Sequence, residues 1–399
     1  MIFTPYIPIL KGGITVFNIQ TKNKISSIGL DRFNENYFIA DEMENPDAII
    51  LRSASLHEME FPSSLKAIAR AGAGVNNIPV DRCSEQGIVV FNTPGANANA
   101  VKELVLCGLF LASRKVVPGI DWAKTLKGNG AEVGKMVEKG KGAFVGPEIA
   151  GKKLGVIGLG AIGGLVANAA THLGMEVIGY DNFISVDAAW HLSRSVKKAA
   201  SLKEIYENCD YITIHVPYMA DTKNYINAEN IAMMKDGVRI LNFSRGELVN
   251  SDAIIEAVKS GKVACYVTDF ANDDQLCVDN IICMPHLGAS TPESEDNCAR
   301  MAADELIAFL NTGNIKNSVN FPNVEAEMTG DKRICIMHRN VPTLIAQFTN
   351  ALAGLNIENL VNKSRKDMAY TIIDVTGEVT DKMLEDIKAV DGVVGFRVI

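Results

Sequence analysis

The sequence lacks the features that mark nucleic-acid-binding and membrane proteins. Its 47 acidic residues outnumber its 39 basic residues and give a net charge of −8, so the overall field does not attract nucleic acid or an anionic membrane. No segment approaches about 18 uncharged apolar residues, so no transmembrane helix is expected. The apolar residues 1–10 contain two prolines and no cationic start, which argues against a signal peptide. We therefore predict a cytoplasmic protein without nucleic-acid or membrane partners, in which local arginines would hold any anionic substrate.

The sequence also lacks the patterns typical of metal sites and disulfide frameworks. None of its eight cysteines forms a CxxC pair or a Cys/His cluster with metal-ligand spacing. Several cysteines, including Cys107, Cys265 and Cys335, lie inside apolar runs. We therefore predict reduced core thiols in a cytosolic protein and no bound metal.

Apolar residues are numerous enough for large cores. At 399 residues, of which 47% are hydrophobic and 22% charged, the chain has the composition of a globular protein with about two or three domains. Short apolar runs at 48–51, 67–70 and 87–91 alternate with helical stretches and predict a first parallel α/β layer. A helix is expected over about 97–115, and the glycine-rich stretch 127–151 is expected to be a loop with a short strand.

Residues 153–181 have the sequence of a complete dinucleotide-binding unit. An apolar run leads into the motif Gly158-Leu-Gly160-Ala-Ile-Gly163, a helical stretch follows, and a second apolar run ends at Asp181. Gly158 permits a tight turn, Gly160 lets backbone N–H groups approach a pyrophosphate at the positive end of the helix, and Gly163 lets helix and strand pack closely. Asp181 would accept hydrogen bonds from ribose hydroxyls and repel a 2′-phosphate, so NAD is predicted rather than NADP. The simpler alternative is a glycine-bearing turn in another kind of α/β protein.

Four further apolar runs after Asp181 predict a doubly wound parallel sheet. Helical segments separate these runs, which cover residues 211–216, 238–243, 263–268 and 280–284. Ligands of such sheets bind at the carboxyl ends of the strands. Polar residues that directly follow these runs are therefore candidate site residues.

Arg245, Asp274 and His286 occupy such positions. Oxidising a 2-hydroxy acid requires a base that takes the hydroxyl proton while hydride leaves for nicotinamide, and histidine suits this role near neutral pH. A carboxylate on its other ring nitrogen would fix the tautomer, and an arginine would bind the substrate carboxylate and polarise the carbonyl oxygen. The three residues are candidate catalytic residues. The alternative is that they are ordinary surface or loop residues.

The C-terminal part of the sequence predicts a separate small domain. A helix is expected over about 292–311, followed by a linker at 317–323. The remaining segments alternate in the order βαββαβ, which describes a ferredoxin-like domain. The expected strands are 333–338, 356–363, 368–376 and 393–398, and the expected helices are 341–353 and 380–389.

Taken together, these motifs resemble the D-2-hydroxyacid dehydrogenase family, and within it the members that act on 3-phospho-D-glycerate. The similarity covers nearly the whole chain, and five motifs occur in the family's order, at residues 70–77, 91–94, 158–163, 244–246 and 285–291. The resemblance implies an α/β fold in which a Rossmann-type NAD domain is inserted in a flavodoxin-like substrate domain, with a ferredoxin-like ACT domain at the C-terminus. The implied bounds are 1–96 and 287–320 for the substrate domain, 97–286 for the NAD domain and 327–399 for the ACT-like domain.

The resemblance also assigns roles at the reaction centre. The family's catalytic trio of Arg, Glu and His corresponds to Arg245, Asp274 and His286. Aspartate at 274 departs from the family's glutamate and is one methylene shorter, so it could pair with His286 only if the backbone lies closer; Asp273 is the alternative partner. Asp269 is placed against the nicotinamide amide. The implied cofactor contacts are Gly158, Gly160, Ala161, Ile162, Gly163, Asp181, His215, Pro217, Thr222 and Asp269.

The implied substrate contacts lie in the first part of the chain. Arg52 and Arg70 match positions that hold the 3-phosphate, and surface solubility is their alternative role. Lys139 or Lys141 could contribute from a neighbouring subunit. The implied substrate contacts are Arg52, Ser53, Arg70, Gly74 and Val75, which lie near the substrate carboxylate or phosphate, and Asn97 of the substrate loop.

The ACT-like domain implies an effector site. Related enzymes bind serine there, and His338, Asn340 and Asn356 match the contacting positions. Thr343 stands where glycine is common, and the connection before Asn356 is about two residues short, so a purely structural dimerisation module is the alternative. The resemblance implies a homodimer through the NAD domain, or a homotetramer if the ACT-like domains also pair.

The implied activity is NAD-dependent oxidation of 3-phospho-D-glycerate to 3-phosphohydroxypyruvate, the first step of L-serine biosynthesis. One alternative is a glyoxylate or hydroxypyruvate reductase of the same family, against which Arg52, Arg70 and the ACT-like tail argue. Another is a non-catalytic NAD-sensing protein, which the presence of both Arg245 and His286 disfavours.

Overall fold

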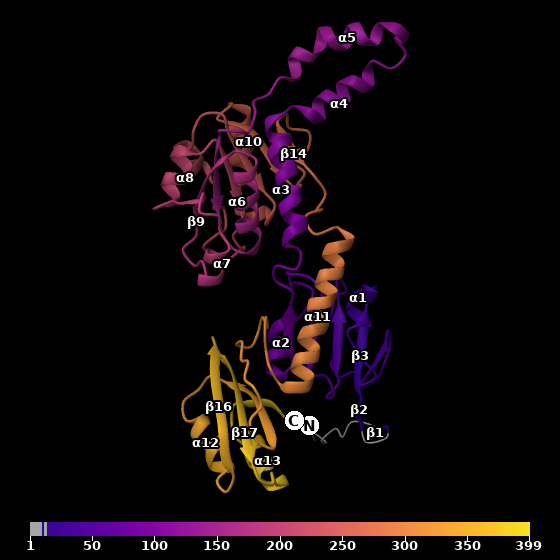
Figure 1. Ribbon diagram of the computed structural model, residues 1–399, viewed down its shortest axis with the longest axis vertical. Helices are drawn as coiled ribbons and strands as arrows, with labels where there is room; N and C mark the ends of the chain where they lie inside the picture. The colour runs from indigo at the N-terminus through magenta and orange to yellow at the C-terminus, as the bar shows by residue number, and fades with distance from the viewer. Residues whose placement is uncertain (1–9, 12–13) are drawn as a thin grey trace. The chain divides into compact units, whose positions relative to one another are not determined.

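The computed structural model describes residues 10–11 and 14–399, which form two compact units. Unit 1 comprises Met1–Asn97 and Pro292–Ile399, and unit 2 comprises Ala98–Thr291 (Figure 1). Residues 1–9 lie outside the described residues, so the predicted lack of a signal peptide stays a prediction. Of the helices in the described part of the chain, none combines the length and apolar composition that a membrane span requires.

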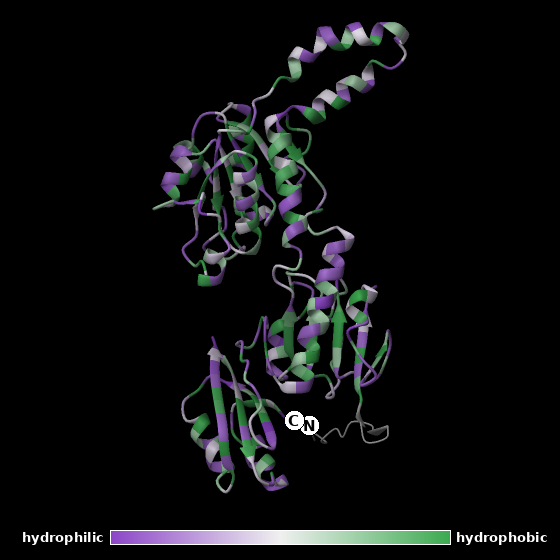
Figure 2. Cartoon of the chain, viewed as in Figure 1, coloured by the Kyte–Doolittle hydropathy of each residue, from purple (hydrophilic) through white to green (hydrophobic). Residues whose placement is uncertain are grey.

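Unit 1 contains a five-stranded parallel sheet, as the apolar runs predict. The strand order is β4-β3-β5-β6-β7, with every neighbouring pair parallel. The side chains of β5, β6 and β7 are largely buried, whereas β3 carries several hydrophilic residues (Figure 2). The strands are β3 (Phe17–Lys22), β4 (Tyr37–Ala40), β5 (Ala48–Leu51), β6 (Ala67–Arg70) and β7 (Val89–Asn92), with short helices α1 (Ser27–Leu30) and α2 (Val80–Glu85) in the connections.

The long helix α11 (Pro292–Thr312) returns to this sheet after the chain has passed through unit 2. Its apolar face packs against β5, β6 and β7, and its other side contacts α1. The approach to α1 is close because a Cβ built on Gly29 would lie 2.5 Å from the backbone of Ala299. A side chain at position 29 would therefore push the two helices apart.

Unit 2 is a doubly wound α/β domain with a seven-stranded sheet. The strand order is β10-β9-β8-β11-β12-β13-β14, and all neighbouring strands are parallel. From β8 the chain first adds β9 and β10 on one side and then β11 to β14 on the other, which confirms the predicted Rossmann-type fold. The strands are β8 (Lys153–Ile157), β9 (Glu176–Tyr180), β10 (Lys197–Lys198), β11 (Tyr211–Ile214), β12 (Val238–Asn242), β13 (Val263–Thr268) and β14 (Ile281–Cys283). The helices that cover it include α3 (Ala98–Ser113), α6 (Ala161–His172), α8 (Leu202–Asn208), α9 (Ala228–Met233) and α10 (Ser251–Lys259).

A helical extension follows α3, and its second helix lies in the stretch 127–151, where the sequence predicted a loop with a short strand. Its helices α4 (Val116–Thr125) and α5 (Val133–Gly140) project from the body of unit 2 (Figure 1), and neither contains a buried residue. A contact between the rings of Trp122 and Phe144, with centroids 5.2 Å apart, ties the extension together. The loop prediction for 127–151 was therefore wrong. Cys107 on α3 is exposed rather than part of a core, because it faces away from the sheet that α3 covers.

The C-terminal segment of unit 1 forms the predicted ferredoxin-like βαββαβ module. Its antiparallel sheet has the order β16-β17-β15-β18. Thr343, where glycine was expected, has the left-handed backbone conformation (φ 72°) that glycine adopts without strain. The elements are β15 (Lys332–Arg339), α12 (Leu344–Ala351), β16 (Asn356–Arg365), β17 (Met368–Thr376), α13 (Asp381–Lys388) and β18 (Val393–Val398).

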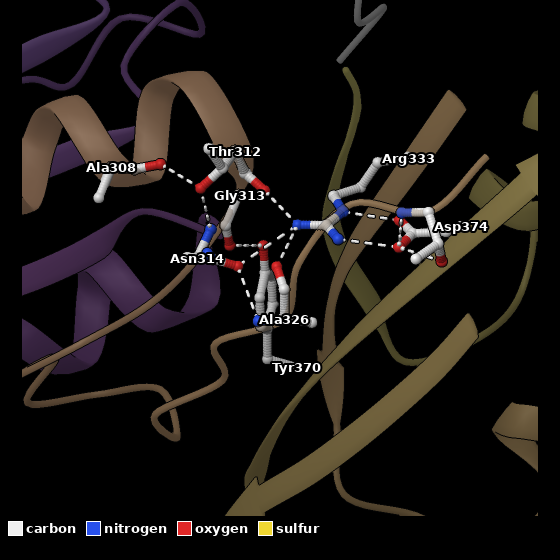
Figure 3. Close-up of polar contacts among 9 residues, drawn as sticks. Ala308, Thr312, Gly313, Asn314, Ala326, Arg333, Tyr370 and Asp374 are labelled. Atoms are coloured by element: carbon white, nitrogen blue, oxygen red, sulfur yellow. Dashed lines mark hydrogen bonds and ion pairs between the residues drawn. The ribbon is translucent and has the colours of Figure 1, made fainter. Parts of the chain in front are cut away.

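A buried ion pair fixes this module to the end of α11 (Figure 3). Arg333 and Asp374, both fully buried, make two hydrogen bonds of 2.6 and 2.8 Å. Arg333 also donates to the carbonyl oxygens of Thr312 (2.8 Å) and Ala326 (3.0 Å). Because Thr312 ends α11, the pair joins the module to the helix as well as stabilising its own sheet.

The predicted linker at 317–323 is instead part of the packed structure. Ser318 forms a β-bridge with Phe91, and the side chain of Asn320 accepts a hydrogen bond from Val90 N (2.9 Å). Phe321 is fully buried in the core. The segment therefore adds to the edge of the β7 strand, and the linker prediction was wrong.

Candidate active site

The glycine motif of unit 2 makes the turn that a dinucleotide requires. Gly158 has φ +90°, and a Cβ there would lie 2.5 Å from the carbonyl oxygen of His215. A Cβ on Gly163 would lie 1.9 Å from the carbonyl oxygen of Gly158. The absence of a side chain at position 163 therefore permits the close approach of α6 to β8. Gly160 has no atom within 4 Å of its missing Cβ. The space before Gly160 is therefore open to a ligand.

The N-terminus of α6 is available for an anion. The helix begins at Ala161 and Ile162 with Gly160 as its N-cap, and no side chain caps its first N–H groups. Unpaired N–H groups at a helix start attract phosphate because donors and helix dipole point the same way. The turn and the open helix start together fit the pyrophosphate of NAD.

Asp181 directly follows β9, beside this turn. Its carboxylate accepts hydrogen bonds from Leu159 N (2.8 Å) and Phe183 N (2.7 Å), so both oxygens are fixed in orientation by backbone groups. Each oxygen keeps a further lone pair for a ribose hydroxyl. The position fits the role that the sequence assigned to it.

The loop after β11 carries His215, Pro217 and Thr222. His215 Nε2 lies 2.9 Å from the Thr213 hydroxyl, whereas Nδ1 is buried and has no partner. Burial lowers the pKa of His215 to about 4, so the ring is neutral at physiological pH. The Thr222 hydroxyl accepts from Met219 N (2.7 Å) and donates to Pro217 O (2.8 Å), which shapes the loop.

Asp269 follows β13 and holds a buried carboxylate with one unused oxygen. Oδ2 accepts a hydrogen bond from Gly288 N (3.0 Å), and Oδ1 is buried without a partner. Burial raises the pKa of Asp269; the Gly288 N–H and the charges of His286 and Arg245 oppose that rise. A buried acceptor without a donor is costly unless a ligand supplies one. An amide N–H such as that of nicotinamide fits this oxygen.

Phe270 contacts both candidate catalytic side chains of unit 2, His286 and Arg245. Its ring centroid lies 4.6 Å from that of the His286 ring and 6.0 Å from the Arg245 guanidinium carbon. Arg245 also donates to the carbonyl oxygen of Ser244 (2.6 Å). Both side chains are exposed, so they can reach a small substrate.

The carboxylate partner of His286 is not in place. In the described part of the chain, no hydrogen bond or ion pair joins His286 to Asp274 or Asp273, and both aspartates are exposed. The shorter side chain at 274 agrees with this separation. The pairing of His286 with either aspartate stays a prediction, and the aromatic contact with Phe270 is what orients the imidazole in the structure.

The candidate phosphate ligands lie together in unit 1, at the carboxyl ends of β5 and β6. Arg70 Nε donates to the carbonyl oxygen of Arg52 (3.1 Å), which sets the two arginines side by side. Ser53 N donates to the side chain of Asn23 (3.0 Å). Gly74 and Val75 follow in the loop after β6, and Asn97 is the last residue of this part of unit 1.

The three candidate effector residues are not together within one chain. His338 is buried, and its ring nitrogens contact Arg339 O and the Thr371 hydroxyl, each at 2.8 Å. Asn340 donates to Lys366 O (3.1 Å) at the same end of the sheet. His338 lies opposite Ala369 near the start of β17, whereas Asn356 pairs with Thr376 at the far end of that strand.

Three residues with a clear place at these sites were missed by sequence reasoning. Phe270 directly follows Asp269, and an aromatic residue beside a predicted cofactor contact was the available signal. Asn23 and Glu295 contact the Arg52 segment from elements distant in sequence. Nothing local in the sequence indicates those two contacts.

The comparisons with known proteins agree with this geometry. The family model of the D-isomer specific 2-hydroxyacid dehydrogenase NAD-binding domain matches residues 111–288. A D-3-phosphoglycerate dehydrogenase of Haemophilus influenzae is 31% identical over 355 residues, which is 86% of this chain and 83% of the relative. The chain belongs to the D-2-hydroxyacid dehydrogenase family. The residues that match its NAD-binding domain, 111–288, lie within unit 2, and the predictions of family, fold class and cofactor are confirmed.

Other relatives and solved structures extend the comparison. A D-3-phosphoglycerate dehydrogenase of Methanocaldococcus jannaschii is 35% identical over 73% of this chain, which spans about half (55%) of that relative's length. Two dehydrogenase structures share the fold: Rhodotorula graminis D-mandelate dehydrogenase (TM-score 0.65, 24% identity, 78% of this chain and 99% of that one) and NAD-bound Entamoeba histolytica 3-phosphoglycerate dehydrogenase (TM-score 0.59, 24% identity, 76% and 99%).

Proposed function

We propose that this dehydrogenase oxidises 3-phospho-D-glycerate to 3-phosphohydroxypyruvate with NAD, the first step toward L-serine. The observation that carries the proposal is the pair Arg52 and Arg70 at the carboxyl ends of two neighbouring strands, which offers two guanidinium groups to a phosphate. Relatives named D-3-phosphoglycerate dehydrogenase at 31–35% identity support it. We assign the substrate-binding role to 1–96 and 287–320, cofactor binding to 97–286 and a regulatory role to 327–399.

The reaction follows from the roles of the residues. Bound NAD supplies the hydride acceptor. His286 takes the proton of the 2-hydroxyl, and Arg245 binds the carboxylate and stabilises charge on the developing carbonyl oxygen. The Phe270 ring lies against both side chains. Asp274 or Asp273 would complete the dyad by moving toward His286.

NADH formation tests the activity directly. We expect the protein to reduce NAD with 3-phospho-D-glycerate at a much higher kcat/KM than it reduces glyoxylate with NADH. His286→Ala should lose turnover by at least about a hundredfold while NADH still binds, since general-base catalysis contributes about 10²–10⁴-fold. Full turnover by this variant would exclude the mechanism. A preference for glyoxylate or hydroxypyruvate would instead identify a reductase, and NADH binding with no turnover would favour an NAD-sensing protein.

We further propose that two copies associate through the α4–α5 extension. Helices of this length without buried residues are marginally stable alone, so they require a surface to cover them. Exposed apolar side chains are available on it, including Val117 (40% exposed), Ile120 (51%) and Val145 (73%). Ile120→Lys should convert a dimer to a monomer in light scattering. Lys141 pairs with Glu138 within the extension. Ile120→Lys also tests whether Lys139 or Lys141 contributes to the site of a neighbouring subunit, because the variant should separate the two copies.

A serine effector site would require two ferredoxin-like modules. His338 and Asn340 lie at one end of the sheet and Asn356 at the other, so one chain cannot bring all three around one amino acid. Two modules paired side by side could place Asn356 of one copy beside His338 of the other, which also fits a tetramer. Adding serine to the NADH assay tests this: a concentration-dependent change in rate supports an effector, and no change supports a structural module.

We place the enzyme in the cytoplasm, where its eight thiols remain reduced.

A further inference from the structure

Arg52, one of the two candidate phosphate ligands, is paired with a carboxylate of its own unit. Its Nη1 lies 2.9 Å from Oε1 of Glu295, and the two side chains are 38% and 43% exposed. Glu295 belongs to the first turn of α11, whereas Arg52 directly follows β5. A phosphate that arrives at Arg52 therefore meets a guanidinium group that already has a counter-ion.

Hydrogen bonds fix the main chain at Arg52. The carbonyl oxygen of Arg52 accepts hydrogen bonds from Arg70 Nε and Asn77 Nδ2, both at 3.1 Å. The next amide, Ser53 N, donates to Asn23 Oδ1 (3.0 Å). Moving the end of β5 would break all three bonds. A rearrangement that separates the pair is therefore a movement of side chains, and the Glu295 side chain, which is 43% exposed, can turn toward solvent.

We propose that Glu295 is a specificity-determining residue that competes with the substrate phosphate for Arg52. A dianion bound to Arg52 would lie within a few ångströms of the Glu295 carboxylate, and like charges at that distance repel. Binding thus requires Glu295 to leave the arginine and turn toward solvent. Glu295 thereby weakens the binding of phosphorylated substrate, so a higher substrate concentration is needed to fill half of the sites. This inference rests on the proposed function for the identity of the substrate.

The competition should act on phosphorylated ligands alone. Glycerate has the same carbon skeleton and carboxylate as the proposed substrate but carries no group for Arg52. The charge of Glu295 should therefore leave the KM for D-glycerate unchanged. A partly exposed ion pair limits the size of the effect on phosphorylated ligands to about fivefold in affinity.

The test is Glu295→Gln, which keeps the shape of the side chain and removes its charge. We expect the KM for 3-phospho-D-glycerate to fall about threefold to fivefold, with kcat and the KM for D-glycerate unchanged. Glu293→Gln is the matched control, because Glu293 lies in the same turn, is exposed and forms no ion pair among the described residues. It changes the net charge equally and should leave both KM values as they are.

A binding measurement separates this inference from the proposed activity. Inorganic phosphate titrated calorimetrically into the NAD-free protein should bind about threefold to fivefold more tightly to Glu295→Gln than to the parent and the Glu293→Gln control. Equal or weaker binding by Glu295→Gln overturns the inference. If the parent fails to oxidise 3-phospho-D-glycerate and the variant still binds phosphate more tightly, the proposed activity fails and the role of Glu295 stands. Should Glu295→Gln fold poorly, Glu295→Ala tests the same change in charge.

Discussion

The burial of Glu305 predicts that unit 1 becomes less stable as the pH rises. This carboxyl group on α11 is 6% exposed; Oε1 accepts a hydrogen bond from Asn317 Nδ2 (2.8 Å), and Oε2 is buried without a partner. Burial raises the pKa of Glu305 to about 8, while the Asn317 hydrogen bond acts in the opposite direction. Glu305 is therefore largely protonated at neutral pH in the folded protein and ionised in the unfolded chain.

The sign of the effect follows from proton linkage. Because the folded pKa is raised, the stabilisation is complete below the unfolded value of about 4.5 and is lost as pH rises through about 8. Between pH 6 and 8 the folded state holds a proton that the unfolded state has released. With about 1.4 kcal/mol per pH unit over the steep part of this range, the free energy of unfolding should fall by about 2 kcal/mol. That corresponds to a decrease in melting temperature on the order of 5 °C for a unit of this size.

Calorimetric melting at pH 6, 7 and 8 measures this decrease. Glu305→Gln removes the titrating group and should make the melting temperature of unit 1 nearly independent of pH across this range. Glu85→Gln, an exposed glutamate on α2, is the control and should retain the pH dependence of the parent. If the melting temperatures of the parent and of Glu305→Gln decrease by the same amount between pH 6 and 8, Glu305 does not titrate in this window and the reasoning is refuted.

Three further variants test the packing of the two units. Asp374→Ala leaves Arg333 buried without its carboxylate and should cost about 3–5 kcal/mol in urea unfolding; a loss below about 1 kcal/mol would contradict a structural role for the pair. Gly163→Ala places a methyl group 1.9 Å from the Gly158 carbonyl oxygen and should weaken NADH binding at least tenfold by fluorescence titration, and parent-like binding would show that α6 can shift. Thr343→Gly relieves a left-handed threonine and should stabilise the chain by up to about 1 kcal/mol; destabilisation would mean that the threonine side chain has a compensating contact.

Much of the fold could be predicted because local pattern and tertiary structure agree. The strands 368–376 and 393–398 of the C-terminal module begin and end as expected, since apolar alternation and turn residues mark both ends. The helix α5 was missed because its glycines favour a loop. Val133, Met136 and Val137 nevertheless form an apolar stripe at helical spacing, and helix formation outweighs a cost of about 1 kcal/mol for each interior glycine.

The segment 317–323 was misjudged for a different reason. Its asparagines and proline indicate a linker, and nothing local shows that Ser318 will bridge to Phe91 or that Phe321 will enter the core. Those contacts join residues more than two hundred positions apart, and sequence periodicity carries no information at that separation.

The candidate site divides along the same line. Gly158 and Asp181 could be named from sequence because each stands at a fixed place relative to a strand end, whereas Asp269 was named from the family resemblance. The contact between Phe270 and His286 and the pair of Arg52 with Glu295 depend on how separate segments fold together. The family pattern suggested a carboxylate for His286; the structure shows its ring against Phe270, and the pairing with Asp274 or Asp273 stays a prediction.

The helix α11 links two of these tertiary features within unit 1. Its first turn carries Glu295, which holds Arg52 at the candidate phosphate site. Its last carbonyl groups are bound from the C-terminal module, where Arg333 donates to Thr312 O and Arg397 donates to the carbonyl oxygens of Phe309 and Leu310. About 17 residues of continuous helix, roughly 25 Å, separate the two ends. One helix therefore carries both the carboxylate that pairs with a candidate phosphate ligand and the carbonyl groups that anchor the C-terminal module.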